Sequence, residues 1–554
     1  MKSDTWAGLS QVALLLVALA VVYRPLGGYL AHVYTSARHW KVERLVYRLV
    51  RVDPDSEQRW STYARGVLGF SFVSVVLLYL LQRLQTVLPL GLGRPEITPS
   101  VAFNTAVSFV TNTNWQSYVP ETAFGHLVQM AGLTVQNFVS AAVGMAVAVA
   151  VIRGFVRAGT DRLGNVWVDI TRGVIRVLLP LSLVFAVLLI GLGVVDSLSA
   201  GVAVTGIDGA QHTIALAPAA SQEAIKELGT NGGGVFNANS AHPFENPNAW
   251  TNQVEIFLVL VIPVSLTRTF GLMVGDRRQG HAILSVMALL WGGMLAVIWW
   301  AEAHPNGPAA LLAGAGMEGK ETRFGVPSSA LFADSTTGTS TGAVNAAHDS
   351  LSGLGGGGAM LNMLFSEISP GGVGTGIYSI LVFAVVAVFL AGLMVGRTPE
   401  YLGKKLGRKE VTMASIAMLA MPTLVLVMAG IAVVLPATAG ALTNFGAHGL
   451  SEVLYAYAST ANNNGSAFAG ITVTSDWFQS TLGVAMALGR FIPILAVLCL
   501  AGGLAVQKKV PLSAGTLPTS GPLFVSMVAG TVLLVAALTF VPALALGPIA
   551  EALS

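Results

Sequence analysis

The sequence predicts an all-α polytopic membrane protein with ten transmembrane helices, eight of which form four span–pore loop–span repeats while two are extra. Three observations predict this fold class. The composition is poor in charge, ten long apolar runs follow one another along the chain, and four similar polar clusters lie between consecutive runs.

The composition of the 554-residue chain excludes a series of soluble domains. Hydrophobic residues make up 54% of the sequence and charged residues only 10%, whereas soluble domains carry about 25% charged residues. The single cysteine, Cys499, excludes internal disulfide bonds and any metal or iron–sulfur site built from several cysteines.

Ten uncharged or nearly uncharged runs have the length of about 20 residues that crosses a hydrocarbon core of about 30 Å. They are Thr5–Tyr23, Gly66–Gln82, Leu127–Ile152, Val177–Val195, Ile256–Val274, Ala282–Ala301, Ile377–Gly396, Val411–Leu435, Phe478–Leu504 and Leu523–Leu546. The runs are continuous rather than alternating, which excludes a closed barrel. Arg24 follows the first run in place of a cleavage site, so we expect that run to be a retained helix rather than a signal peptide.

Basic residues concentrate in alternate loops and predict the topology. Segments 24–65, 153–176, 268–278, 397–409 and 508–509 hold 23 of the 30 Lys and Arg residues. The positive-inside rule places these loops in the cytoplasm and both termini outside. The same segments, together with Glu410 directly after the fourth, hold nine of the 27 acidic residues. The excess of acidic residues outside either attracts cations or is a by-product of the topology.

Four outer segments share one pattern: a serine, a short helical stretch, and a cluster of Thr, Asn and Gly. The clusters are Thr111–Trp115, Gly229–Gly234, Thr339–Ala343 and Thr460–Ser466, and the serines are Ser100, Ser221, Ser328 and Ser451. Their near-regular spacing indicates an internally duplicated fold. We expect each serine to be the N-cap of a re-entrant helix that is too short to cross the membrane.

The residue types of the clusters indicate a site for a monovalent cation. Backbone carbonyls and the side-chain oxygens of Thr and Asn bind a dehydrated ion such as K⁺ without fixed charge, whereas a divalent ion prefers carboxylates. Glycine permits the backbone angles that turn carbonyls toward one axis. One such cluster alone is more often a plain turn, but four in matching positions predict a pore.

Five stretches are characteristic of a known family: Thr111–Gln116, Thr230–Gly234, Gly275–Gly280, Gly396–Lys405 and Asn462–Phe468. Over its whole length the chain resembles the potassium-binding A subunit of the Kdp potassium-transporting ATPase, KdpA, in the superfamily of potassium transporters. The resemblance implies a channel-like subunit that takes K⁺ from outside and passes it through an intramembrane tunnel. It implies as partners a P-type ATPase subunit, KdpB, which hydrolyses ATP, and the smaller subunits KdpC and KdpF.

The resemblance also implies the residues of a selectivity filter. They are Thr111, Asn112, Thr113, Asn114, Thr230, Asn231, Gly232, Thr341, Gly342, Asn463, Asn464 and Gly465. In this resemblance Asn112, Thr230, Thr341 and Asn463 match the corresponding filter positions of the four repeats. Thr341 stands where the family is expected to have cysteine, and it is still an oxygen donor.

Four further residues are candidates for the ion path or its gating: Gln116, Glu367, Arg397 and Arg490. Glu367 lies in a bend rich in Pro and Gly, and an ionisable residue at membrane depth indicates a function; the alternative is a capping carboxylate. Arg490 needs a carboxylate or carbonyl partner within its apolar span, and it serves either structural pairing or a barrier to leakage. Gln116 alternatively only hydrogen-bonds the filter backbone.

We expect no ATP site in this chain. The stretch Gly314–Lys320 fits the start of a phosphate-binding loop, but Glu321 stands where Ser or Thr should bind Mg²⁺. The chain is therefore predicted to be a non-catalytic subunit that carries K⁺, has no organic cofactor, contacts membrane lipid and binds no nucleic acid. A passive K⁺ channel, a K⁺ symporter and a scaffold with a vestigial pore remain as alternatives.

The predicted organisation has six units. They are the first helix with its cytoplasmic loop (1–65), four pore repeats (66–152, 153–275, 276–396 and 397–505), and the last helix (506–554).

Overall fold

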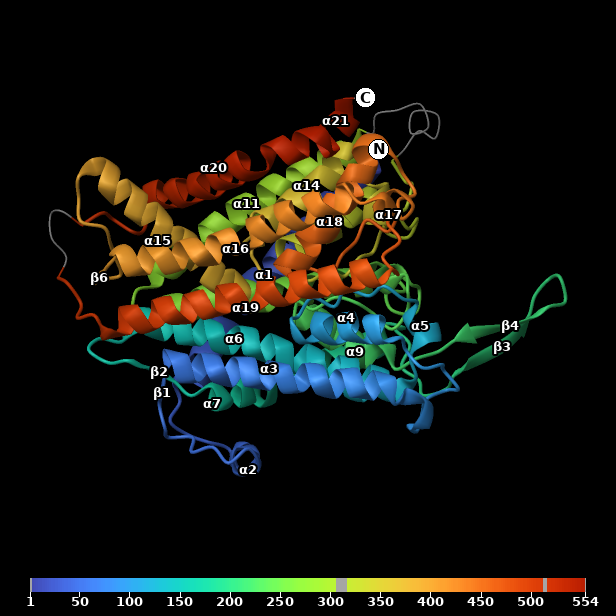
Figure 1. The fold of residues 1–554 in the computed structure, drawn as a ribbon, viewed down its shortest axis with the longest axis horizontal. Coiled ribbons are helices and arrows are strands. Elements are labelled where there is room, and N and C mark those ends of the chain that lie inside the picture. The colour runs from blue at the N-terminus through green and yellow to red at the C-terminus, as the bar shows by residue number, and fades with distance from the viewer. Residues whose placement is uncertain (1, 305–315, 512–515, 554) are drawn as a thin grey trace.

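The computed structural model describes residues 2–304, 316–511 and 516–553, which form a bundle of long helices (Figure 1). Within these residues ten helices are long and apolar enough to cross a membrane, and each overlaps one predicted run. The helices of these spans are α1 (Lys2–Thr35), α3 (Trp60–Arg83), α6 (Val135–Val156, in the span Val128–Val156), α8 (Leu179–Gly191, in the span Val166–Gly191), α10 (Ala249–Met273), α11 (Arg277–Ala303), α15 (Thr375–Val395), α16 (Arg408–Val433), α19 (Asp476–Val506) and α20 (Pro522–Leu546). The predicted membrane fold is confirmed.

Two spans contain a π-helical segment. The segment Val128–Thr134 leads into α6, and Gly173–Leu178 joins α7 (Val166–Arg172) to α8. The first span is longer than its apolar run, because α1 continues past Arg24 to Thr35.

Four short helices lie between consecutive spans: α4 (Pro99–Val110), α9 (Ala219–Leu228), α13 (Gly325–Gly338) and α18 (Gly446–Asn462). At 10 to 17 residues they are too short to cross a membrane. The resulting repeats are α3–α4–α6, α8–α9–α10, α11–α13–α15 and α16–α18–α19, with α1 and α20 as the extra helices. The residue limits predicted for the six units stay a prediction.

The predicted N-caps of these short helices are wrong. The N-cap residues are Thr98, Pro218, Phe324 and Phe445, and the four serines lie inside the helices. Backbone restrictions set the starts instead. Pro99 has the fixed φ that suits a first helical position, while Gly325 and Gly446 turn the chain with φ of 69° and 70°.

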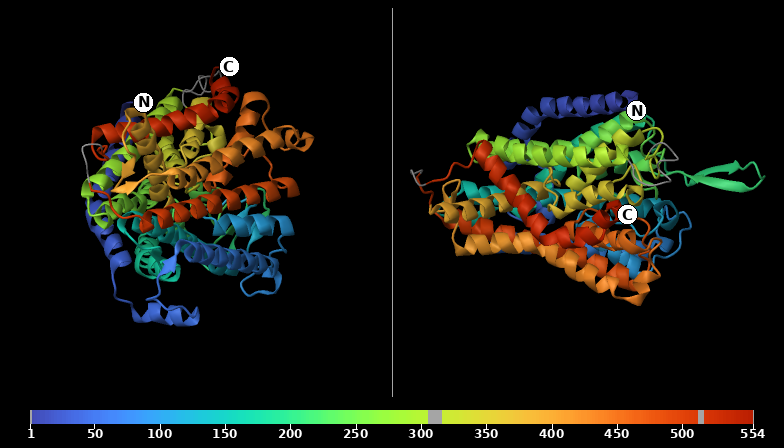
Figure 2. Two further views of the ribbon diagram at one scale, coloured as in Figure 1. Left: turned by 60° about the vertical axis from the view of Figure 1, so that its left-hand side comes forward. Right: turned by 90° about the horizontal axis from the view of Figure 1, so that it is seen from above.

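The remaining elements are short, and the three strand pairs lie at the ends of the bundle. The antiparallel hairpin of β3 (Gly201–Thr205) and β4 (Gln211–Ala215) projects from one end (Figures 1 and 2). Two other strand pairs are β1 (Gln58–Arg59) with β2 (Arg162–Gly164) and β5 (Glu400–Tyr401) with β6 (Lys404–Lys405). The other helices are α2 (Lys41–Leu49), α5 (Pro120–Ala123), α14 (Gly353–Leu364), α17 (Pro436–Ala439), α21 (Pro548–Leu553) and three 3₁₀ turns (Gln85–Val87, Asn239–Ala241, His348–Ser350).

The two ends of the bundle differ in the way the topology requires. Both termini lie toward the end that carries β3 and β4, whereas β1, β2 and β6 lie at the opposite end (Figure 1). The strands at that opposite end belong to basic loops, which include Arg162, Lys404 and Lys405. Which end faces the cytoplasm stays a prediction.

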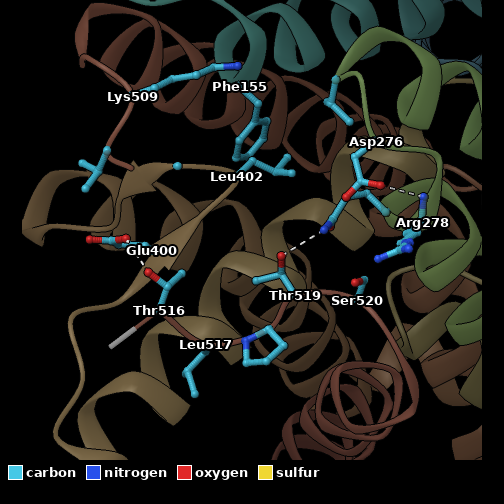
Figure 3. Close-up of a pocket in the computed structure, with 15 residues that line it drawn as sticks. Phe155, Asp276, Arg278, Glu400, Leu402, Lys509, Thr516, Leu517, Thr519 and Ser520 are labelled. Atoms are coloured by element: carbon cyan, nitrogen blue, oxygen red, sulfur yellow. Dashed lines mark hydrogen bonds between the residues drawn. The ribbon is translucent and has the colours of Figure 1, made fainter. Parts of the chain in front are cut away.

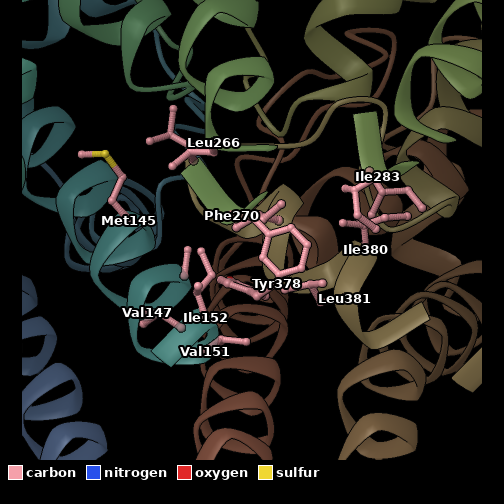
Figure 4. Packing of buried hydrophobic residues seen from close by; sticks show 14 of the residues in the cluster. Met145, Val147, Val151, Ile152, Leu266, Phe270, Ile283, Tyr378, Ile380 and Leu381 are labelled. Carbon is pink, nitrogen blue, oxygen red and sulfur yellow. The ribbon is translucent and has the colours of Figure 1, made fainter. Parts of the chain in front are cut away.

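The second span of every repeat is more buried than the first. In the most apolar part of each span, 56–83% of residues are buried in α6, α10, α15 and α19, against 28–50% in the first spans and 17% in α1. The second spans therefore form an inner layer and the others an outer layer. Figure 4 shows the inner packing, in which Val151, Phe270, Ile283 and Tyr378 converge from α6, α10, α11 and α15.

An ion pair between Arg153 of α6 and Asp169 of α7 is hydrogen-bonded to α1 and α3 as well. Arg153 at the end of α6 donates from Nη2 to Asp169 Oδ1 at 2.9 Å and to the carbonyl of Tyr34 in α1 at 3.1 Å. The hydroxyl of Tyr63 in α3 donates to the other carboxylate oxygen of Asp169 at 3.0 Å. Asp169 is 1% exposed, so removal of its charge leaves Arg153 buried without its counter-ion.

We expect Asp169→Asn to destabilise the protein by about 3–5 kcal/mol, because breaking a buried ion pair strands one charge. The measurement is the Tm of the purified protein in detergent. Asp161→Asn is the matched control: Asp161 pairs with Arg59 at 2.7 Å but is 40% exposed, and exposed pairs contribute about 0–1 kcal/mol. Equal Tm values for Asp169→Asn and the control would contradict the assignment.

Candidate pore ring

The four loops that follow the short helices share one backbone shape. We call residues 111–116, 229–234, 339–344 and 463–468 pore loops 1 to 4. In each loop two residues with positive φ flank one middle residue. The flanking pairs are Asn112 and Asn114, Thr230 and Gly232, Ser340 and Gly342, and Asn463 and Gly465, with φ between 48° and 107°. The middle residues are Thr113, Asn231, Thr341 and Asn464.

Each middle residue is bonded to its helix in the same way. The N–H of the middle residue donates to the carbonyl five residues earlier, at 2.9, 2.7, 3.2 and 2.8 Å in pore loops 1 to 4. Each short helix thus ends directly at its loop, with the partial negative charge of its C-terminal end beside the loop.

Glycines bring three pairs of loops into contact. A Cβ built on Gly232 would overlap the carbonyl oxygen of Thr341, one on Gly342 that of Asn464, and one on Gly465 that of Thr113. Pore loop 2 thus contacts loop 3, loop 3 contacts loop 4, and loop 4 contacts loop 1. No side chain fits between these loops.

Side-chain hydrogen bonds join the last pair of loops. Asn112 donates from Nδ2 to the carbonyl of Thr230 at 2.7 Å, and Asn114 donates from Nδ2 to the carbonyl of Gly232 at 3.1 Å. Gln116 and Gly234 exchange two hydrogen bonds of 3.0 Å each. The four loops therefore form a closed ring.

The carbonyls of the four middle residues are free oxygens at equivalent positions of this ring. All four residues are fully buried, and among the described residues no hydrogen bond to these carbonyls is formed. The side chains are used elsewhere, since the hydroxyls of Thr113 and Thr341 contact those of Thr111 and Thr339 at 2.8 and 2.7 Å. A buried carbonyl without a donor is costly, and a ring of four is a ligand set for a dehydrated cation.

The structure places Ser340, rather than Thr341, in the position of Asn112, Thr230 and Asn463. The hydroxyl of Ser340 donates to the carbonyl of Asn463 at 2.9 Å. Sequence analysis missed this residue. The signal was present, because Ser340 stands two residues before Gly342, as Thr230 does before Gly232.

Glu367 lies directly behind pore loop 4. It is 3% exposed, and one of its oxygens accepts a hydrogen bond from Nδ2 of Asn464 at 2.8 Å. Ser366 and Glu367 both have positive φ, 62° and 47°, and such backbone strain clusters at functional sites. Glu367 thus contacts a middle residue of the ring directly.

The two candidate arginines are placed differently. Arg490 is buried in α19, with Nη2 3.3 Å from the position of a Cβ on Gly144. No salt bridge of Arg490 forms within the described ranges. Arg397 is exposed after the end of α15. Because α15 starts near the ring and its 21 residues span about 30 Å, Arg397 is not brought to the site.

Two of the characteristic stretches meet far from the ring. A cavity of about 620 Å³ is lined by Asp276, Arg278, Glu400, Leu402 and Thr519, at the end of the bundle that carries β5 and β6 (Figure 3). Gln279 and Thr519 are hydrogen-bonded across it at 3.0 Å. The stretches Gly275–Gly280 and Gly396–Lys405 therefore shape that end of the chain.

The stretch Gly314–Lys320, which resembles the start of a phosphate-binding loop, lies only partly within the described residues. Gly314 and Ala315 lie outside the described residues. Lys320 Nζ lies 2.7 Å from Glu302 Oε2, and both side chains are buried, so this amine is already paired.

Comparison with known proteins agrees with the geometry. The model of the family described as potassium-transporting ATPase A subunit, KdpA, matches residues 13–553. The chain is 62% identical to the potassium-transporting ATPase potassium-binding subunit of Rhodococcus erythropolis over 99% of both chains. It is 61% identical to the protein of the same name from Mycobacteroides abscessus over 100% of both.

A solved structure has a similar fold. The potassium transporter TrkH from Vibrio parahaemolyticus superposes with a TM-score of 0.54 at 14% sequence identity, covering 86% of this chain and 97% of that chain. This likeness concerns the fold alone. The family match spans nearly the whole chain and the two relatives are 61–62% identical to it, so the chain belongs to the potassium-transporting ATPase A subunit family.

Proposed function

We propose that this chain binds and selects K⁺ for an ATP-driven uptake complex. The observation that carries the proposal is the closed ring of four buried middle carbonyls without donors. Neutral oxygens suit a monovalent cation, because they replace its hydration shell without the strong field of carboxylates. The names of the relatives, which are potassium-binding subunits of a potassium-transporting ATPase, favour the same ion.

K⁺ enters the ring from the end that carries both termini and the β3–β4 hairpin, which faces the outside of the cell membrane. Glu367 and Arg490 lie on the path beyond the ring, and Gln116 holds pore loops 1 and 2 together. The ion then passes to a P-type ATPase subunit, KdpB, in a complex with KdpC and KdpF. The basic end of the bundle supports this orientation through the positive-inside rule.

The experiment that tests the proposal is ATP hydrolysis by the complex purified with its co-expressed neighbouring subunits, titrated first with K⁺ and then with Na⁺. Stimulation by K⁺ alone is the expected result. If no ATPase subunit co-purified and the chain alone carried a K⁺ current in liposomes, the function would instead be that of a passive channel.

We expect Gly232→Ala to raise the K⁺ concentration for half-maximal stimulation by about tenfold or more. A loss of about 1.4 kcal/mol in the free energy of K⁺ binding is enough for a tenfold change in affinity. The added methyl group would displace the carbonyl of Thr341, and φ of 78° disfavours alanine. Gly232→Asp should be worse, since it also adds a charge. The measurement is the K⁺ concentration for half-maximal ATP hydrolysis, with Rb⁺ in parallel.

Gly209→Ala is the matched control for this backbone strain. Gly209 has a φ of 80° in the β3–β4 hairpin, and no atom lies within 4 Å of an added Cβ. Its K⁺ dependence should stay normal. An unchanged K⁺ and Rb⁺ response in Gly232→Ala would remove Gly232 from the filter.

We expect Glu367→Gln to reduce K⁺-stimulated ATP hydrolysis more than it reduces assembly of the complex. Glutamine keeps an oxygen that accepts the hydrogen bond of Asn464 but loses the negative charge. Turnover at saturating K⁺ and subunit stoichiometry after purification measure the two effects. Normal turnover would exclude Glu367 from the ion path.

A further inference from the structure

A fully buried group of charged side chains lies behind pore loop 2. Glu223, Lys226 and Glu227 extend from α9, Glu255 from α10, and Glu245 from the loop between these helices. All five are at most 1% exposed. We call these residues the α9–α10 cluster.

The charges of the α9–α10 cluster do not balance. It holds four carboxylates and one ammonium group. Lys226 Nζ already lies 2.6 Å from Glu223 and 2.6 Å from Glu245. In the part of the chain that the structure describes, no other basic side chain forms a salt bridge with these carboxylates. Uncompensated buried carboxylates are strongly unfavourable unless a proton or a cation neutralises them.

Three oxygens of this cluster have no partner. Both oxygens of Glu255 and Oε2 of Glu227 are buried without a hydrogen bond to any described residue. The hydroxyl of Ser240 donates to one oxygen of Glu223 at 2.8 Å and to the other oxygen of Glu227 at 3.2 Å. The unpartnered oxygens therefore belong to Glu255, which forms no salt bridge with Lys226, and to Glu227, whose other oxygen lies 3.9 Å from Lys226 Nζ.

The geometry of these oxygens fits one hard ion. Glu223, Glu227 and Glu255 each offer one oxygen, and the three oxygens lie within 4.8 Å of one another. Mg²⁺ and Ca²⁺ bind oxygen at about 2.1–2.6 Å, so a small movement of these side chains brings all three oxygens to one such ion. We propose that Glu223, Glu227 and Glu255 bind a divalent cation of this class, Mg²⁺ or Ca²⁺, as a site separate from the ring of backbone carbonyls.

This site would support pore loop 2 through two short connections. The carbonyl of Lys226 accepts the N–H of Asn231, the middle residue of that loop, at 2.7 Å. One oxygen of Glu245 accepts the N–H groups of Val235 and Phe236, each at 2.9 Å. A cation between α9 and α10 removes the repulsion that would otherwise separate the helix carrying the loop from its neighbour.

A second cluster in the same chain lacks these features. Asp349, His448 and Glu452 also lie close together. Both ring nitrogens of His448 already contact carboxylates, Nδ1 that of Glu551 at 2.9 Å and Nε2 that of Asp349 at 3.2 Å. These contacts raise the pKa of His448 to about 10. Its positive charge therefore already compensates the carboxylates of this cluster.

The test uses the full chain purified with its co-purifying subunits, in constant K⁺ and without ATP. The protein is treated with EDTA and dialysed, then Mg²⁺ or Ca²⁺ is added alone, and the Tm and the bound metal are measured. Wild type should retain a stoichiometric amount of one of the two ions, and its Tm should rise with that ion.

Glu255→Gln should lose the bound metal and the metal-dependent rise of Tm. In EDTA it should be more stable than wild type, because one uncompensated charge is gone. Asp334→Asn is the matched control, because Asp334 is another fully buried carboxylate with one unpartnered oxygen but stands outside the cluster. It should bind metal as wild type does.

Two outcomes would overturn the site. Wild type that retains neither ion and keeps the same Tm in EDTA, Mg²⁺ and Ca²⁺ shows that protons neutralise the cluster. Equal metal retention by Glu255→Gln and wild type shows that the metal binds elsewhere. Neither outcome depends on K⁺ stimulation of ATP hydrolysis, so the proposed K⁺ function is tested independently.

Discussion

The ring depends on three positions that cannot carry a side chain. Gly232, Gly342 and Gly465 each lie against the carbonyl of a neighbouring loop, and an added Cβ at any of them would displace a middle residue of the ring. Positive φ at these positions turns the chain, and the absence of a Cβ allows the next loop to approach. Asn114 occupies the fourth such position and uses its side chain to bond pore loop 2.

The helical bundle holds these loops at membrane depth. Irregular backbone is tolerated there only where protein buries it or an aqueous cavity is present, and the inner layer of α6, α10, α15 and α19 supplies that burial. Close packing in this layer again depends on small residues. A Cβ on Gly154 of α6 would lie 2.7 Å from the Cα of Ala501 in α19. Lipid drives such packing weakly, so close fit between helices is what stabilises it.

Much of the fold could be predicted from the sequence because the spans are defined locally. A run of about 20 apolar residues is stable in lipid as a transmembrane helix. The four loops can be recognised by their composition and spacing. The helix starts were missed because the fixed φ of Pro99 and the positive φ that Gly325 and Gly446 permit set them, rather than a serine cap. Ser340 was missed because composition alone does not define register, although its spacing to Gly342 matches that of Thr230 to Gly232.

The ring order and the supports behind each loop could not be predicted, because they depend on contacts between distant residues. Gly465 meets Thr113 across more than three hundred residues, and Glu255 joins Glu223 from another helix. A ring built from four identical chains would have the same residues behind every loop. This single chain places a buried carboxylate cluster behind pore loop 2 and Glu367 behind pore loop 4. The ring is fourfold in backbone conformation but asymmetric in the charged side chains behind its loops.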